Sequence, residues 1–224
     1  MGCNIAIDGP AGAGKSTIAK KVAKELSFIY VDTGAMYRAM AYFLLQQNIE
    51  GSDEKAIEES CCRARISIEY QNGEQVVLLN GKNVNPYLRS EEVGNMASVS
   101  SANPKVRQQL LMLQRTLAQE NDVVMDGRDI GTTILPNAQV KIYLTASADT
   151  RARRRSLELT EKGIPCDLEE IRRDIIERDE RDMNREVSPL RQADDAVLVD
   201  SSNMTIEEVA DRIIRIYKEK IKGC

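Results

Sequence analysis

The sequence predicts an α/β fold in which a parallel sheet is flanked by helices. Two observations favour this class. Short apolar segments alternate with helical patterns, as in βαβ units, whose strands pair in parallel. A glycine-rich loop also follows the first apolar segment directly. Because ligands of such sheets bind at the carboxyl ends of the strands, we expect the functional loops there. Four apolar segments end at that edge in an acidic residue, namely Asp8, Asp32, Asp126 and Asp200.

The first strand and its loop carry the strongest signal. Residues 5–7 are apolar, and residues 9–16 match the template G-x-x-x-x-G-K-[ST]. Glycines let backbone N–H groups approach a polyphosphate, and a helix that starts near Lys15 turns its positive end toward the same charge. We expect Lys15 to reach the β- and γ-phosphates and Ser16 to offer a hydroxyl to Mg²⁺. The predicted nucleotide-binding loop comprises Gly9, Pro10, Ala11, Gly12, Ala13, Gly14, Lys15, Ser16 and Thr17.

The elements that follow complete the predicted core. Ile18, Val22 and Leu26 give the first helix one apolar face for the sheet. Further buried strands are expected at residues 28–32, 122–126, 140–145 and 196–200. The segment 205–221 has helical spacing of apolar residues, and we interpret it as a packing helix with Ile206, Val209, Ile213 and Ile216 on its inner face.

Two segments depart from this alternation. Residues 64–87 alternate as antiparallel strands do, with turns at Asn72-Gly73 and Asn80-Gly81, and predict a small β insert. Residues 151–185 form two highly charged helical stretches separated by Gly163 and Pro165. This composition is typical of a solvated, mobile lid.

The composition excludes several classes of function. The chain has 31 basic and 35 acidic side chains, a net charge of −4, and only 4% aromatic residues, which argues against a nucleic-acid partner. It contains no histidine, so imidazole catalysis and Ser-His-Asp chemistry are excluded. The odd number of cysteines, 5, favours reduced thiols over disulfides. Without an apolar run near 18 residues or a signal peptide, we expect a cytoplasmic protein with no membrane association.

Further clusters of charge follow the strands. Arg38 lies one helical turn after Gly34, and Asp126 ends a strand as a Walker B carboxylate does, with Arg128 two residues later. For the arginine run at 151–155, a solvated helix face is an equally good interpretation. Phosphoryl transfer onto an acceptor that is already an anionic phosphate needs many cations and no general base, which suits this chain.

Four motifs together resemble the bacterial-type cytidylate kinases, of the P-loop nucleoside monophosphate kinase superfamily. They are IAIDGPAGAGKST, DTGAMYR, DGRDIGT and ERDERDMNR, and the match extends over essentially the whole chain. The resemblance implies transfer of the γ-phosphoryl group of ATP to CMP and dCMP with Mg²⁺, by a monomer. It implies a P-loop kinase core at 1–33, 104–150 and 186–224, a nucleoside-monophosphate-binding part with the β insert at 34–103, and a helical lid at 151–185.

The resemblance also assigns site residues, which are expectations at this point. Lys15, Arg38, Arg128 and Arg155 would act in catalysis, and Ser16 and Asp126 would hold the metal. Thr33, Arg38 and Arg128 would bind the acceptor phosphate, with Asp126 beside them. Arg178 and Asp182 would contact the sugar. Ser98, Arg107, Asp129 and Arg185 would contact the cytosine, and Arg154 and Arg155 the phosphates of ATP.

Three other functions were weighed against this one. A kinase for UMP, AMP or a hydroxylated metabolite would share the same loop, and only the acceptor would differ. A P-loop regulatory GTPase would need an N-K-x-D motif, which the sequence lacks. Nucleic-acid binding is disfavoured by the negative net charge.

Overall fold

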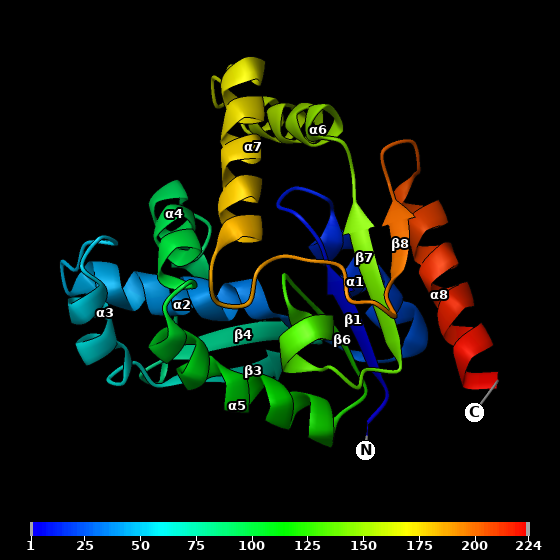
Figure 1. Ribbon diagram of the computed structural model, residues 1–224, viewed down its shortest axis with the longest axis horizontal. Coiled ribbons are helices and arrows are strands. Elements are labelled where there is room, and N and C mark those ends of the chain that lie inside the picture. The colour runs from blue at the N-terminus through cyan, green and yellow to red at the C-terminus, as the bar shows by residue number, and fades with distance from the viewer. Residues whose placement is uncertain (1, 223–224) are drawn as a thin grey trace.

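The computed structural model describes residues 2–222 and contains the expected parallel sheet (Figure 1). Its five strands run in the order β2-β6-β1-β7-β8, and every neighbouring pair is parallel. The bounds lie within two residues of the predicted ones: β1 Asn4–Asp8, β2 Ile29–Asp32, β6 Val123–Gly127, β7 Val140–Thr145 and β8 Val197–Asp200. The α/β fold class is thereby confirmed.

Helices cover both faces of this sheet because successive side chains of a strand point to opposite faces. Ile5 and Ile7 of β1 pack in one cluster with helices α1 (Lys15–Leu26) and α8 (Ile206–Lys222). Ala6 lies in a second cluster, which includes residues of α2 (Thr33–Gln46) and α5 (Pro104–Glu120). The sheet is thus the middle of three layers, and its loops emerge at one edge.

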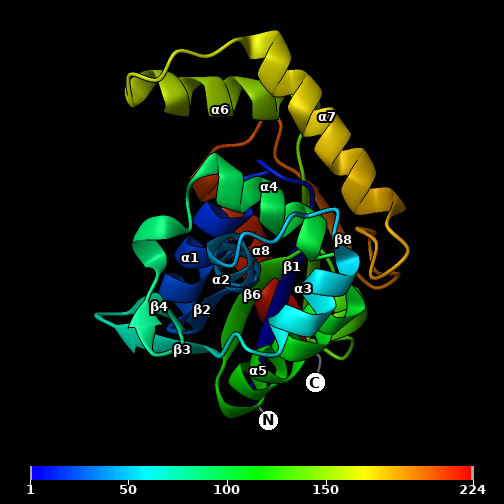
Figure 2. The same cartoon turned by 90° about the vertical axis from the view of Figure 1, so that its left-hand side faces the viewer.

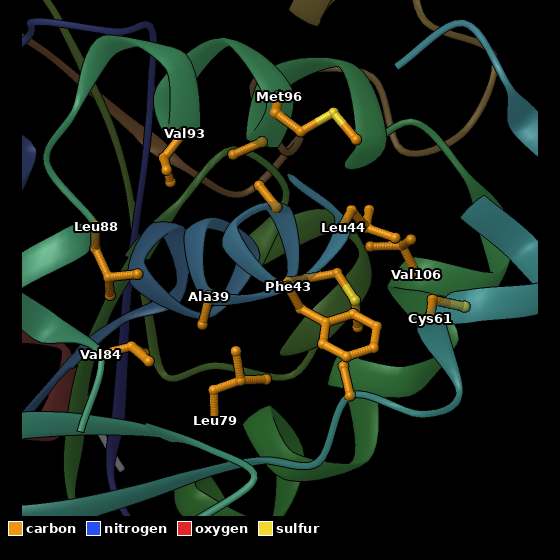
Figure 3. Close-up of a cluster of buried hydrophobic side chains, with 14 of the residues drawn as sticks. Ala39, Phe43, Leu44, Cys61, Leu79, Val84, Leu88, Val93, Met96 and Val106 are labelled. Carbon is orange, nitrogen blue, oxygen red and sulfur yellow. The ribbon is translucent and has the colours of Figure 1, made fainter. Parts of the chain in front are cut away.

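The predicted β insert is a separate antiparallel sheet of β3 (Ile66–Gln71), β4 (Glu74–Leu79) and β5 (Lys82–Asn83). Both predicted Asn-Gly turns are present, with positive φ at Asn72, Gly73, Asn80 and Gly81. The insert shares a core of its own with α2, α3 (Glu54–Cys61) and α4 (Glu91–Ser100), shown in Figure 3. The short helix η1 (Asn85–Tyr87) follows β5.

The predicted pair of charged helices is also present, as α6 (Ala148–Glu161) and α7 (Leu168–Asn184). Figures 1 and 2 show the pair extending beyond the carboxyl edge of the sheet. Gly163, with φ 69°, lies in the connection. The helix α6 starts three residues before the expected beginning of the lid at 151. The division of the chain into core, nucleotide-binding part and lid stays a prediction.

One element was not expected from the sequence, a π-helix over Ile130–Ile134 that directly follows the GRD segment. Both carboxylate oxygens of Asp8 accept hydrogen bonds from its first amides, at 2.8 Å from Ile130 N and 2.8 Å from Gly131 N. Arg115 donates to the carbonyl oxygens of Thr133 and Ile134. Asp8 was expected near a ligand, but it holds this turn in place.

The last helix, α8, packs on the sheet as predicted, with one exception. Val209 and Ile213 are buried, and Ile216 is half-buried against the same cluster. The assignment of Ile206 to the inner face was wrong, since its side chain is 46% exposed. Ile206 is the first residue of α8, and the first buried residue of this helix is Val209.

Two expectations on composition can be compared with the described residues. Cys3, Cys61, Cys62 and Cys166 are free thiols, as expected, and Cys224 lies outside the described residues. No helix within residues 2–222 is long and apolar enough to span a membrane.

The two isoleucines of α8 give a matched test of this packing. We expect Ile213→Ala, which removes a fully buried side chain, to lower the free energy of unfolding by about 2–5 kcal/mol. Ile206→Ala, at the exposed end of the same helix, should change it by about 0.5 kcal/mol or less. Urea denaturation of both variants measures the difference. Equal losses would contradict the packing of α8 described here.

Candidate active site

The glycine-rich loop joins β1 to α1 at the carboxyl edge of the sheet. Gly9 passes so close to Leu144 that any side chain would collide with its carbonyl oxygen, and Gly14 caps α1 with a φ of 84°. Lys15, the first residue of α1, is buried and donates from Nζ to the carbonyl oxygen of Pro10 at 2.7 Å. Burial, reinforced by the positive charge of Arg128, lowers the pKa of Lys15 to about 7. A polyphosphate on this loop would restore the charge of the ammonium group.

Asp126 at the end of β6 connects three elements. Ser16 donates from its hydroxyl to Asp126 Oδ2 at 3.0 Å, and the hydroxyl of Tyr30 donates to Oδ1 at 2.9 Å. Thr33 donates to the backbone carbonyl of Asp126 at 2.7 Å. Burial and the neighbouring Asp32 raise the pKa of Asp126 to about 6. Adjacent hydroxyl and carboxylate oxygens are ligands that suit Mg²⁺, which would also favour the charged carboxylate.

Asp32 at the end of β2 forms ion pairs with two arginines. Its Oδ1 accepts from the amide of Ala35 at 2.8 Å and so caps α2. Its Oδ2 lies 3.1 Å from Arg38 Nη2 and 3.5 Å from Arg89 Nη2. Arg38 lies in a motif that could be recognised in the sequence, whereas Arg89 lies 57 residues from Asp32 and in no motif. The buried Nε of Arg38 has no partner among the described residues.

The helix α7, in the predicted lid, reaches the same edge through Asp182. Its Oδ2 accepts from Arg128 Nε at 2.9 Å. Burial alone would raise the pKa of Asp182, but the hydrogen bond from Arg128 and the positive charges of Arg128, Arg185 and Arg178 together lower it. Arg178, one turn earlier on α7, is close enough to Arg128 for repulsion and burial to lower its pKa. The predicted sugar residues and one predicted phosphate residue are therefore neighbours.

The four residues expected to contact cytosine form one buried group. Arg107 of α5 pairs with Asp129 Oδ2, and Arg185 Nη2 lies 3.8 Å from Asp129 Oδ1. Arg107 also donates to the carbonyl oxygen of Ser101 at 3.2 Å and lies over the ring of Tyr37. The carbonyl oxygen of Ser98 accepts from the Ser101 hydroxyl at 3.0 Å, while the buried hydroxyl of Ser98 itself has no partner among residues 2–222.

The arginines of the predicted lid bond to three different parts of the protein. Arg154 donates to the carbonyl oxygen of Ser201 at 2.7 Å, and the exposed Arg155 pairs with Glu158 at 2.9 Å. Arg151 instead reaches the glycine-rich loop, donating to the carbonyl oxygen of Ala11 at 2.9 Å. It is held by Asp179 of α7 at 2.6 Å. The arginine run at 151–155 contains Arg151, but no sequence signal distinguishes it from Arg154 and Arg155 or identifies its partners.

The fold and this site together define a class of protein, the P-loop kinases that act on nucleoside monophosphates. The comparisons with known proteins narrow it. The family model described as "Cytidylate kinase" matches residues 5–219. A cytidylate kinase of Geobacillus sp. (strain WCH70) is 49% identical over 97% of this chain and 97% of its own length. One of Lactobacillus johnsonii is 49% identical over 98% of this chain and 95% of its own length. The chain belongs to the cytidylate kinase family.

A solved structure supports the fold alone. An uncharacterised protein from Eubacterium ventriosum matches 96% of this chain and 97% of its own, with a TM-score of 0.51 and 13% identity.

The lowered pKa of Lys15 predicts proton uptake when ATP binds. At pH 8 the unliganded lysine is mostly neutral, because its pKa is about 7. The negative charges of ATP raise this pKa, so binding should take up about one proton per site. Calorimetry without Mg²⁺ at pH 8, in buffers of different ionisation heat, measures the uptake. In Lys15→Met it should disappear; an equal uptake in both proteins would contradict the assignment.

Proposed function

We propose how this member of the cytidylate kinase family carries out its reaction, the ATP-dependent phosphorylation of CMP and dCMP to CDP and dCDP. One observation carries the proposal. The carboxyl edge of the sheet gathers the glycine-rich loop, the Asp32–Arg38 pair, the Arg128–Asp182 pair and the Asp129 group. A donor triphosphate, an acceptor phosphate and a base can each meet suitable partners at this one edge.

The donor triphosphate binds on the loop formed by residues 9–17. Its backbone amides and the amino-terminal end of α1 face the phosphates. Lys15 stabilises the charge on the transferring phosphoryl group. Ser16 and Asp126, whose oxygens are 3.0 Å apart, hold Mg²⁺, which neutralises phosphate charge when bound. Arg154 and Arg155 contact the ATP phosphates once the lid closes.

The acceptor phosphate binds to Thr33, Arg38 and Arg128. Asp32 and Asp182 hold the two guanidinium groups in position beforehand. A planar guanidinium can grip two phosphate oxygens at once, which fixes the acceptor for in-line attack. No general base is needed, because the attacking oxygen is already anionic. This agrees with a chain that contains no histidine.

The nucleoside is recognised on the other side of the acceptor site. Arg178 and Asp182 contact the sugar. Cytosine offers an amino donor beside the N3 and O2 acceptors, whereas uracil offers O4 as an acceptor and N3–H as a donor. Asp129 accepts from the amino group, and Arg107 and Arg185 donate to the base, with Ser98 beside them. Uracil would leave these buried groups unpaired.

The lid and the surroundings of the protein complete the proposal. Closure of α6 and α7 over both nucleotides excludes water and limits wasteful hydrolysis of ATP. The protein works in the cytoplasm as a monomer and takes small nucleotides as partners. Its net charge of −4 supports the absence of a nucleic-acid partner.

A coupled assay with ATP, Mg²⁺ and each nucleoside monophosphate tests the function. We expect CMP and dCMP to exceed UMP by about 10² in kcat/KM, since mispaired buried polar groups are costly. Lys15→Met should lower kcat by about 10²–10³ with the fold intact. Preference for UMP or AMP would point to a kinase for another acceptor. Normal turnover of Lys15→Met would refute the mechanism.

A second variant tests the reading of the base. Asp129→Asn should narrow the ratio of kcat/KM for CMP to that for UMP by about tenfold, because an amide can rotate to donate to O4. Asp194→Asn, at an exposed position, serves as the control and should leave the ratio unchanged. If Asp129→Asn lowers both acceptors by the same factor, Asp129 positions Arg107 and Arg185 without reading the base.

A further inference from the structure

The side chain of Gln75 in the β insert makes two hydrogen bonds to the backbone of Asp32. Its Oε1 accepts from the Asp32 amide at 2.9 Å, and its Nε2 donates to the Asp32 carbonyl oxygen at 3.1 Å. Gln75 comes from β4, the strand of the small sheet that lies next to β2 (Figure 2). One amide thus satisfies both backbone groups of the residue that ends β2, in the way a neighbouring strand would.

A second residue of the same hairpin reaches the same strand. The Tyr70 hydroxyl donates to the carbonyl oxygen of Tyr30 at 3.1 Å. Tyr70 and Gln75 are directly opposite each other in the β3–β4 register. Their target, β2, is an edge strand whose ladder partner is β6 on one side only. These two side chains occupy backbone groups on its other side that would otherwise be free.

The place where they bind matters for the acceptor site. Asp32 caps α2 through its carboxylate and pairs with Arg38, and Thr33 follows it immediately. A rotation of the Asp32 peptide would therefore move the Asp32 carboxylate, Arg38 and Thr33. Displacement of Arg38 and Thr33 would weaken their contacts with a bound phosphate and so raise the KM for CMP.

We propose that Gln75 and Tyr70 are positioning residues for the acceptor phosphate. They tie the β insert to the end of β2 and fix the Asp32 peptide, so that Arg38 and Thr33 meet the phosphate in the correct geometry. Neither side chain touches the substrate. This inference rests on the proposed function, in which Thr33 and Arg38 bind the phosphate of CMP.

The hydrogen bonds from Gln75 and Tyr70 to the backbone of β2, here called the clamp, can be removed without unfolding the insert. Val77 and Leu79 anchor β4 in the core of the insert, while Gln75 is half-buried at its end. Methionine has a similar length and shape but neither donor nor acceptor, so Gln75→Met removes both bonds. Gln71→Met is the matched control: Gln71 belongs to the same hairpin and is exposed, and within residues 2–222 its side chain bonds only to Glu69. Tyr70→Phe removes the third bond alone.

We expect Gln75→Met to raise the KM for CMP about threefold to tenfold, the effect of one or two lost hydrogen bonds, with less change in kcat. The KM for ATP should stay within about twofold of wild type, because the glycine-rich loop is untouched. Tyr70→Phe should show a smaller rise in the KM for CMP, and Gln71→Met none.

Hydrogen exchange of the Asp32 amide, followed by NMR, tests the clamp without any activity. This amide should exchange at least about tenfold faster in Gln75→Met than in wild type or Gln71→Met. A wild-type protein inactive on CMP would overturn the proposed function and the positioning role with it, while the exchange would still show whether the clamp exists. With wild type active, a lower melting temperature but an unchanged KM for CMP, or equal Asp32 exchange in all proteins, would overturn the proposal.

Discussion

The hydrogen bonds of Asp126 hold the active site together. Its side chain binds Ser16 of the glycine-rich loop and Tyr30 of β2, and its carbonyl oxygen binds Thr33 of α2. These contacts require that β1, β2 and β6 end at the same level, which the parallel register provides by pairing Asp32 with Asp126 and Asp8 with Gly127. The sheet therefore sets the distance between the proposed donor and acceptor sites.

The cations of the site are held in advance by carboxylates. Arg128 forms an ion pair with Asp182, and Arg151 forms one with Asp179. Arg107 and Arg185 both pair with Asp129. Burying charge costs free energy, and these pairs offset part of that cost while they orient each guanidinium. Such an arrangement suits phosphoryl transfer, in which the protein contributes position and charge rather than a proton-transfer group.

Local patterns in the sequence predicted much of the site. The glycine-rich template identified Lys15 and Ser16, and the apolar strand before Asp126 identified a carboxylate at the sheet edge. Both signals are local, because a strand, a tight loop and a helix amino terminus depend on neighbouring residues. The π-helix at 130–134 was not predicted, because Asp8, whose carboxylate accepts hydrogen bonds from its first amides, lies 122 residues from Ile130. Arg89 and Gln75 were not predicted either, because their partner Asp32 is also distant in the sequence.

The fold class, the strands, the Asn-Gly turns of the insert and the family can all be predicted from the sequence. These follow from periodicity and from motifs whose residues are close in the chain. Which carboxylate each arginine meets depends on the folded chain, because Arg128 and Asp182 are 54 residues apart, and Arg107 and Asp129 are 22 apart. When several arginines share one helix face, the sequence does not show which of them pairs with a given carboxylate. The packing of α6 against α7 distinguishes them: Arg151 pairs with Asp179 and reaches the glycine-rich loop, while Arg155 lies at the surface and pairs with Glu158.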